Sequence, residues 1–215
     1  IIMSDLISHN LSMIFNSSDG DLIHALKDIK FLLKKGELLT VLGPSGCGKT
    51  TLLNIAAGFL RPTSGEITLG DKEIDGPGVE RGMVFQQGAL FEWLTVEKNV
   101  NFGLRMKNDN RNEIQKKVEY WLDIVGLRGF RNTPTYQLSG GMQQRVALAR
   151  CLINDPELIL MDEPLGALDA LTREKMQSLI LKIWNETGKT IIFITHSVEE
   201  ALLLGERLFV MAPRP

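Results

Sequence analysis

A glycine-rich segment at positions 43–50 combines the residue types that bind the phosphates of a nucleoside triphosphate. It fits the pattern G-x-x-x-x-G-K-[ST] and lies between an apolar run at 38–42 and a helical pattern at 51–57. Its glycines allow backbone N–H groups to converge on phosphate oxygens, and the helix that follows directs its positive end to the same point. Lys49 supplies a charge for the β- and γ-phosphates, and Thr50 supplies a hydroxyl for Mg²⁺. The segment therefore predicts a site for ATP and Mg²⁺.

The thiol of Cys47, within this segment, is not expected to take part in catalysis, because the loop position requires only a small side chain. The predicted nucleotide contacts are Gly43, Pro44, Ser45, Gly46, Cys47, Gly48, Lys49, Thr50 and Thr51.

Two adjacent carboxylates, Asp162 and Glu163, follow a second apolar run at 158–161. In open α/β folds, ligands gather at the carboxyl edge of the sheet. Adjacent residues that leave a strand point in different directions, so the pair can divide its roles. Asp162 is predicted to hold Mg²⁺, and Glu163 is predicted to orient and deprotonate the attacking water. Taken alone, such a pair is equally consistent with a solvated acidic turn.

Gln86 and His196 each follow a predicted strand, at 82–85 and 190–195 respectively. An uncharged amide can contact Mg²⁺ and water without adding a charge, and an imidazole can donate a hydrogen bond to the γ-phosphate or to the attacking water. A lone histidine is more often structural, so neither residue is a strong candidate by itself. Residues 197–200 have the form of a capping box, which predicts a helix start just after His196.

The elements that must position these residues are short apolar strands that alternate with helices. Runs at 38–42, 82–85, 158–161 and 190–194 are typical of strands buried on both faces of a parallel sheet, and the spacing at 112–125 predicts a helix. Segments near 7–15 and 26–33 alternate as antiparallel strands do, with a turn at 16–21, whereas 87–151 is mostly helical. We therefore expect an α/β fold with a mainly parallel sheet, an N-terminal antiparallel β subdomain and an inserted helical subdomain.

The composition fits one domain. The chain has 215 residues, 44% of them hydrophobic, and a formal net charge of −2, which gives no global field for nucleic acid. It contains no apolar stretch of the roughly 18–20 residues that a spanning helix needs, and no signal peptide, so we expect a soluble chain. Cys47 and Cys151 lie in a loop and a predicted helix, which favours a reducing cytosol over a disulfide framework. The sequence ends soon after a last predicted strand at 207–211, so either the domain is minimal or its end is missing.

The octet at 138–145, Leu-Ser-Gly-Gly-Met-Gln-Gln-Arg, closely resembles the signature of ATP-binding cassette (ABC) ATPases. The resemblance covers essentially the whole chain, as one domain with a core at 1–86 and 152–215 and a helical subdomain at 87–151. It implies a P-loop fold and a head-to-tail dimer in which the signature of one copy covers the ATP bound to the other. The residues that match family motifs are Phe15 (adenine stacking), Gln86 (Q-loop), Ser139, Gly140, Gly141 and Gln143 (signature), Asp162 and Glu163 (Walker B), Asp169 (D-loop, 166–169) and His196 (switch).

Segments 76–86 and 164–173 look like those of ATPase subunits of bacterial importers for nitrate, sulfonates and taurine, although Glu92 and Gly166 depart from common family residues. The resemblance implies membrane permease subunits as partners, docked near 86–101, and indirectly a solute-binding protein. It also implies a peripheral location on the cytoplasmic face of the inner membrane and no nucleic-acid partner. Apolar residues at the expected docking segment are either a seat for the partner or local core: Leu90, Phe91, Trp93 and Leu94.

Two other functions share part of this pattern. A non-transport ABC ATPase that acts on nucleic acid or ribosomes would use the same catalytic residues, but the near-neutral charge and the lack of a long coiled-coil insertion disfavour it. A P-loop kinase would transfer phosphate to a small acceptor, and the signature octet and the placement of Glu163 disfavour that reaction.

Overall fold

The computed structural model describes residues 4–16, 20–87, 89–107 and 110–213. Within these residues, a five-stranded parallel sheet has the order β6-β7-β8-β3-β9. Its strands are β3 (Leu38–Leu42), β6 (Arg81–Val84), β7 (Leu158–Asp162), β8 (Thr190–Thr195) and β9 (Arg207–Val210). The predicted α/β fold is confirmed, with strand ends that differ from the expected ones by a residue or so.

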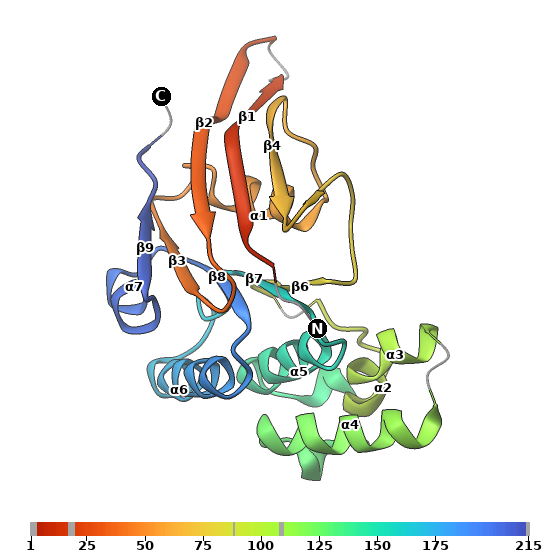
Figure 1. Cartoon of the computed structure of the whole chain (residues 1–215). Helices are drawn as coiled ribbons and strands as arrows, with labels where there is room; N and C mark the ends of the chain where they lie inside the picture. Colours follow the sequence, from red (N-terminus) through yellow and green to blue (C-terminus); the bar gives the residue numbers. More distant parts are fainter. Residues whose placement is uncertain (1–3, 17–19, 88, 108–109, 214–215) are drawn as a thin grey trace.

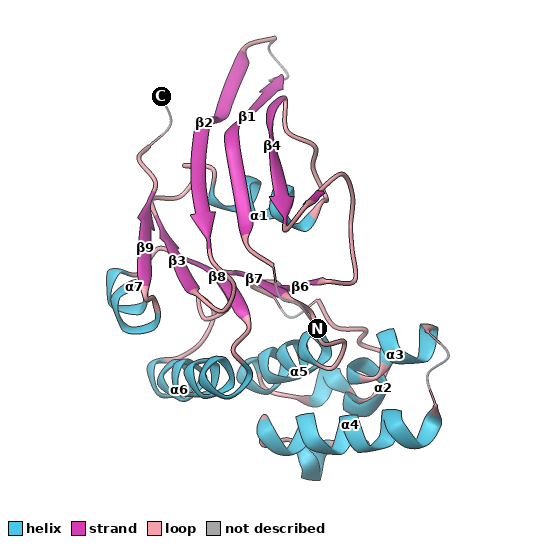
Figure 2. Ribbon diagram, in the orientation of Figure 1, coloured by secondary structure: helices cyan, strands magenta, loops and turns pink. Residues whose placement is uncertain are grey.

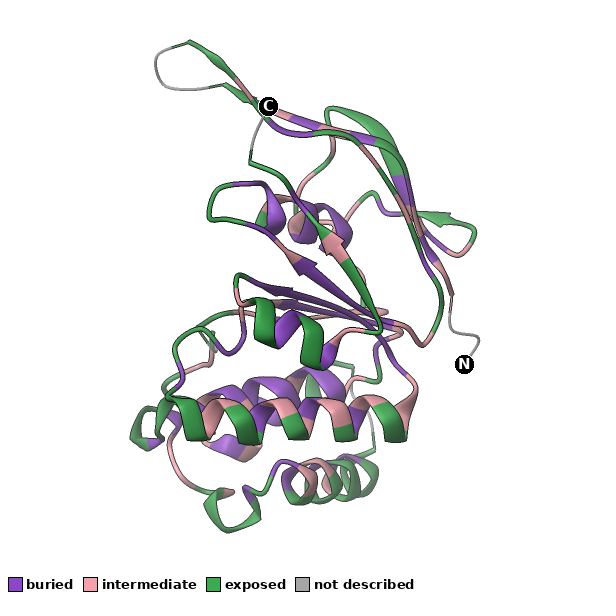
Figure 3. Ribbon diagram, turned by 90° about the vertical axis from the view of Figure 1, so that its left-hand side faces the viewer, coloured by how far each residue is buried: buried purple, intermediate pink, exposed green. Residues whose placement is uncertain are grey.

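The central strands are apolar on both faces because each face covers a separate layer. Successive residues of β7 and β8 alternate between two hydrophobic clusters, as the two-residue period of a strand requires. Leu158, Leu160, Ile192 and Ile194 pack toward α1 (Lys49–Ala57), and Ile159, Met161, Ile191 and Phe193 pack toward α5 (Gly140–Leu152) and α6 (Ala170–Thr187). The buried residues in Figure 3 accordingly lie between the strands and the helices.

A second, antiparallel sheet covers the α1 side of the parallel sheet (Figure 1). Its order is β2-β1-β4-β5, with β1 (Leu6–Asn16), β2 (Leu22–Leu33), β4 (Ser64–Leu69) and β5 (Lys72–Glu73). The first two strands correspond to the predicted pair, although β2 begins at Leu22 rather than near Leu26, whereas β4 and β5 were not expected from the sequence. Part of the predicted turn at 16–21 lies outside the described residues, at 17–19.

Between β6 and β7, the described residues form helices and loops with no named strand (Figure 2). The helices that precede α5 are α2 (Val96–Val100), α3 (Phe102–Met106), α4 (Arg111–Ile124) and the 3₁₀ turns η1 (Arg128–Phe130) and η2 (Thr135–Gln137). They have a hydrophobic cluster of their own, to which α5 also contributes Val146 and Ala149. Because α5 packs against the sheet through Leu148 and Leu152 as well, it ties the helical part to the core. The last helix, α7 (Val198–Leu204), follows β8.

One ion pair joins α2 to the segment after α4. Arg131 donates two hydrogen bonds of 2.7 Å to the carboxylate of Glu97, one from Nε and one from Nη2. The bonded guanidinium lowers the pKa of Glu97 below its ordinary value of 4.5, against an opposing effect of burial. The folded protein therefore binds this proton less tightly than the unfolded chain does, and the pair stabilises the fold above the ordinary glutamate pKa.

We expect Glu97→Gln to lower the unfolding temperature at pH 7 by a few degrees, equivalent to about 1 kcal/mol, because it removes the charge from a half-buried bidentate pair. The difference from the parent should disappear as the pH falls through the lowered pKa, where the parent carboxyl is also neutral. Thermal unfolding followed by circular dichroism at several pH values measures both effects. A destabilisation that did not change with pH would contradict this account.

Candidate active site

The phosphate loop at 43–48 joins β3 to α1 and lies against β2. Gly46 and Gly48 have φ angles of 80° and 104°, a conformation that favours glycine. A Cβ at Gly48 would stand 2.4 Å from the carbonyl oxygen of Ala25, so no larger residue fits there without moving β2. Gly48 caps α1 and offers no side-chain hydrogen bond, which leaves the first N–H groups of the helix available to an anion.

Lys49 is the buried cation of the site, with 5% of its surface exposed. Its ammonium donates hydrogen bonds to the carbonyl oxygens of Gly43 at 2.8 Å and Pro44 at 3.0 Å. A carboxylate oxygen of Glu163 lies 3.6 Å from the same nitrogen. The Lys49 ammonium thus links the phosphate loop to the end of β7, and it lies where phosphate oxygens would bind.

Thr50 and Asp162, two of the three residues predicted to hold Mg²⁺, are neighbours. The Thr50 hydroxyl donates a hydrogen bond of 3.2 Å to Oδ1 of Asp162. Burial raises the pKa of Asp162, and the charge of Glu163 raises it further, while the Thr50 bond and Lys49 act in the opposite direction. Hydroxyl and carboxylate oxygens, completed by phosphate oxygens and water, are the ligands that Mg²⁺ takes in nucleotide sites, so this partly desolvated carboxylate suits the ion.

Glu163 lies directly after β7 with a φ of 43°, a strained conformation for a residue with a side chain. Its N–H donates to the carbonyl oxygen of Ile194 on β8, at 3.1 Å. Its Oε2 lies 3.0 Å from Nδ1 of His196, at the end of the same strand. The backbone turn at Glu163 therefore aims the carboxylate toward both Lys49 and His196.

Gln86 lies just beyond β6, beside the D-loop. A Cβ at Gly166 would come within 3.2 Å of its side-chain nitrogen, so the two positions are close together. Gln86 and Asp162 line one cavity of about 580 Å³, together with Gln143. The side chain is thus placed within the same region as the predicted metal ligands.

The signature lies at the start of α5, and its residue Gln143 lines the same cavity as Asp162. Ser139 is the exposed N-cap of α5, and its hydroxyl accepts a bond of 3.4 Å from the N–H of Met142. Helix α1 packs on one face of the parallel sheet and α5 on the other (Figure 1). Gln143 donates to the carbonyl oxygens of Thr135 and Leu138, at 3.1 and 3.4 Å, so its side chain is directed back along its own chain.

The remaining two predicted contacts lie at the ends of other elements. Asp169 caps α6 and accepts a hydrogen bond of 3.0 Å from the N–H of Thr172. Phe15 lies near the end of β1, opposite Ile23 of β2, and is 36% exposed. The ring is thus accessible on the antiparallel sheet, whose strand β2 lies against the phosphate loop at Gly48, and its adenine contact stays a prediction.

The two signature glycines have different surroundings, which gives a matched pair of variants. A Cβ at Gly141 would lie 2.4 Å from the Thr172 methyl group on α6, whereas a Cβ at Gly140 would meet nothing within 4 Å. We expect Gly141→Ala to lower the unfolding temperature by an amount equivalent to about 1–3 kcal/mol, and Gly140→Ala to leave it nearly unchanged. Thermal unfolding of the two variants measures this, and equal destabilisation would contradict the packing described.

Comparison with known proteins agrees with this geometry. The family model described as ABC transporter matches residues 26–166. The chain belongs to the ABC transporter family. It is 82% identical to a taurine import ATP-binding protein of Pelagibacter ubique (strain HTCC1062) and 68% identical to one of Roseobacter denitrificans (strain ATCC 33942 / OCh 114), each over 99% of this chain and 80% of the relative. An ATP-binding cassette solved as a dimer bound to ADP and phosphate superposes with a TM-score of 0.85 and 35% identity, over 96% of this chain and 94% of the other.

The resemblance inferred from the signature octet and the motif order is thus confirmed, and the chain is an ABC ATPase. The P-loop α/β fold is confirmed by the same superposition. The roles of individual residues are predictions, for which the structure supplies distances and partners. It brings Lys49, Thr50, Asp162, Glu163 and His196 together through direct contacts.

Proposed function

We propose that this chain is the ATP-hydrolysing subunit of an importer for taurine or a related sulfonate. Two copies would close head to tail around two ATP molecules and act on separate membrane subunits. The observation that carries the proposal is that α1, which begins at the phosphate loop, and α5, which begins at the signature, pack on opposite faces of one sheet. In this proposal, the anion that binds at Ser139, at the N-terminus of α5, is the phosphate of an ATP held by the loop of another copy. The similarity to taurine import ATP-binding proteins supports the solute, and the similarity to a dimeric cassette supports the assembly.

In this proposal, the triphosphate is held by the loop N–H groups and by Lys49, which exchanges its bonds to Gly43 and Pro44 for phosphate oxygens. Water attacks the γ-phosphorus in line and gives its proton to Glu163, while the bond to the bridging oxygen breaks to release ADP and phosphate. His196, 3.0 Å from the Glu163 carboxylate, orients the water or the γ-phosphate. Ser139 of the second copy donates to the developing charge.

Mg²⁺ would be held by Thr50, Asp162 and Gln86, and it would neutralise phosphate charge when bound. The hydrogen bond between Thr50 and Asp162 and the shared cavity of Gln86 and Asp162 support this set.

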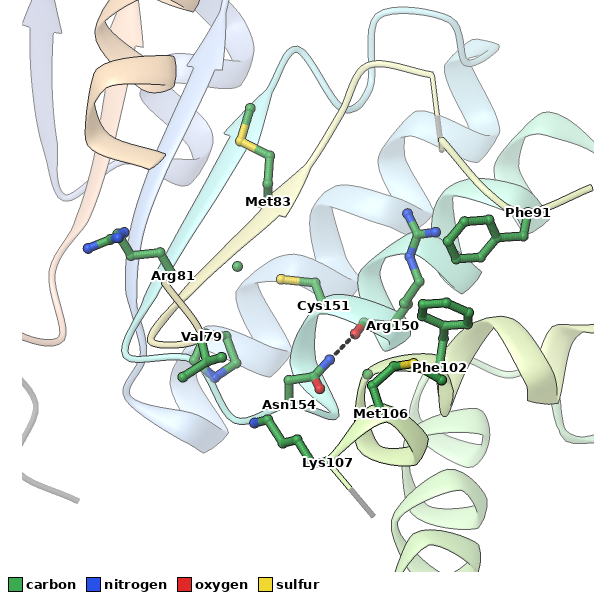
Figure 4. A pocket seen from close by; sticks show the side chains of 13 residues that line it. Val79, Arg81, Met83, Phe91, Phe102, Met106, Lys107, Arg150, Cys151 and Asn154 are labelled. Atoms are coloured by element: carbon green, nitrogen blue, oxygen red, sulfur yellow. Dashed lines mark hydrogen bonds between the residues drawn. The ribbon is translucent and has the colours of Figure 1, made fainter. Parts of the chain in front are cut away.

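A cavity of about 500 Å³ offers a seat for a helix of the membrane subunits. Figure 4 shows Phe91, Phe102 and Met106 on its helical side and Val79, Arg81 and Met83 on its sheet side. The Phe91 ring packs against Phe102 and against Trp93, with centroids 4.5 and 5.5 Å apart. Burial raises the pKa of Cys151 in the cavity wall to about 12, so its thiol is neutral, whereas Arg81, Lys107 and Arg150 contribute cationic side chains to the lining.

The four apolar residues that the sequence grouped as a single segment have different environments. Trp93 is 78% exposed and Phe91 lines the cavity, which supports a contact with a partner. Leu90 packs instead against two clusters of the core. Phe102 and Met106 of α3, which complete the cavity, were not expected from the sequence, although their spacing of four places both on one face of a helix.

We further propose a peripheral location at the cytoplasmic face of the inner membrane, with a solute-binding protein as an indirect partner. Among the described residues, no helix is both long and apolar enough to cross a bilayer. The relatives are import proteins by name, which favours a transport role over the alternative of an ABC ATPase that acts on nucleic acid or ribosomes.

Purification of the chain from membranes tests the proposal, with the bound integral partner identified by mass spectrometry. Trp93→Asp should abolish this co-purification, whereas Tyr120→Asp, which changes an exposed aromatic residue on α4, should not. Vesicles that contain the identified complex should take up taurine with ATP and release one free phosphate per ATP consumed. Uptake of other anions but not sulfonates would overturn the solute, and phosphate transfer to an acceptor would overturn the reaction.

A further inference from the structure

Glu200 binds the residue before the switch histidine rather than the one after it. The expected capping box would direct its carboxylate to the N–H of Ser197. The structure keeps only half of that box, in which the Ser197 hydroxyl accepts from the N–H of Glu200 at 3.3 Å. The Glu200 carboxylate instead accepts a hydrogen bond of 2.6 Å from the Thr195 hydroxyl, and that hydroxyl accepts from the N–H of Ser197 at 3.0 Å. The Glu200 carboxylate therefore holds the Thr195 hydroxyl, and that hydroxyl holds the backbone N–H of Ser197 on the other side of His196.

The other oxygen of Glu200 faces Arg173, in the first turn of α6. Arg173 Nε lies 3.5 Å from Glu200 Oε1, and its Nη2 donates a bond of 2.8 Å to the carbonyl oxygen of Leu168 in the D-loop. The Nε atom is buried and makes no hydrogen bond within the described part of the chain, so its contact with Glu200 is an ion pair. Glu200 is 6% exposed, so a carboxylate that would be costly alone is paired inside the protein.

These contacts form a closed circuit around the catalytic carboxylate. From Glu163, the chain turns through Gly166, whose N–H donates to the Glu163 carbonyl at 3.1 Å, and reaches Leu168. Arg173 and Glu200 then lead to the backbone around His196, and His196 returns to Glu163 at 3.0 Å. The circuit joins the D-loop to the switch histidine through an ion pair whose carboxylate is buried.

We propose that Arg173 and Glu200 are positioning residues that fix the His196 ring relative to the D-loop. The histidine is then placed for hydrolysis only when the D-loop occupies the position it has in this structure. The inference rests on the proposed function, which gives His196 its part in hydrolysis. Arginine suits this position, since one planar group reaches a carbonyl and a carboxylate at once, which a lysine ammonium does less precisely.

The three histidines of the chain allow a direct test by NMR. The Cε1–H signals of the full chain without nucleotide are assigned with His196→Ala. In Arg173→Met and in Glu200→Gln, the His196 signal should move, while His9 and His24, both on the antiparallel sheet, should keep their positions. Arg131→Met, which breaks the Glu97 pair far along the chain, should leave all three unmoved. Glu200→Gln is nearly isosteric, so it serves if Arg173→Met does not fold.

Turnover provides the second measurement. Both variants should lower kcat by about 10- to 100-fold with KM for ATP within about twofold, because small misplacements of catalytic groups have effects of this size. Arg131→Met should change neither. A His196 signal that stays in place in both variants, or an unchanged kcat, would overturn the inference. If the parent chain hydrolyses no ATP while its His196 signal moves as expected, the proposed function fails and the positioning contact stands.

Discussion

Glu163→Gln should retain ATP affinity and lose on the order of 10² to 10⁴ in turnover, the usual contribution of a general base. The amide has the shape of the carboxylate and can still face the Nδ1 atom of His196, which lies 3.0 Å away in the parent. It cannot accept the proton of the attacking water. Binding and closure then proceed without hydrolysis, so the variant should accumulate as an ATP-bound dimer.

Light scattering in the presence and absence of ATP measures the dimer, and phosphate release measures turnover. Glu199→Gln is the matched control, because this exposed carboxylate lies only three positions after His196 in the first turn of α7. It should behave as the parent does. Near-normal turnover in Glu163→Gln would remove Glu163 from the role of base.

Mixing two inactive variants should restore activity if the active site is shared between copies. Lys49→Ala removes the charge at the phosphates, and Ser139→Arg places a bulky side chain at the N-terminus of α5. Each variant alone has no intact site. A mixed dimer has one site with a normal loop and a normal signature, so an equal mixture should recover about a quarter of the parent activity if pairing is random and the sites are independent.

The control for this experiment is the double variant Lys49→Ala/Ser139→Arg mixed with Lys49→Ala. No pairing of these chains creates an intact site, and no activity should return. Scattering should show that ATP promotes dimerisation of the parent chain. Absence of that dimerisation would contradict a site completed by a second copy.

The sequence predicts the parallel strands and the phosphate loop well because their signals are local. An apolar run such as 158–161 that precedes acidic residues identifies both a strand and its functional edge. The N-terminal antiparallel pair is predicted equally well. Strand β4 is harder to predict, since it begins with Ser64 and Gly65 and buries only Ile67 and Leu69.

The contacts of the site depend on tertiary structure and could not be predicted from spacing. Arg173 and Glu200 are 27 positions apart, on two helices that meet only because β8 lies beside β7. A capping-box pattern predicts the start of α7 correctly, but the carboxylate has a second possible donor in Thr195. The hydrogen bond from Thr195, which is made inside the protein, determines where the Glu200 carboxylate points. Local sequence rules do not include that competition.

The left-handed backbone at Glu163 also affects how this protein can be engineered. A non-glycine residue in that conformation costs on the order of 1–3 kcal/mol, which the surrounding packing must offset. Replacement by glycine would relieve that strain and remove the carboxylate. A selection for thermal stability alone would therefore favour variants that have lost the proposed base. Such a selection needs a simultaneous screen for ATP turnover.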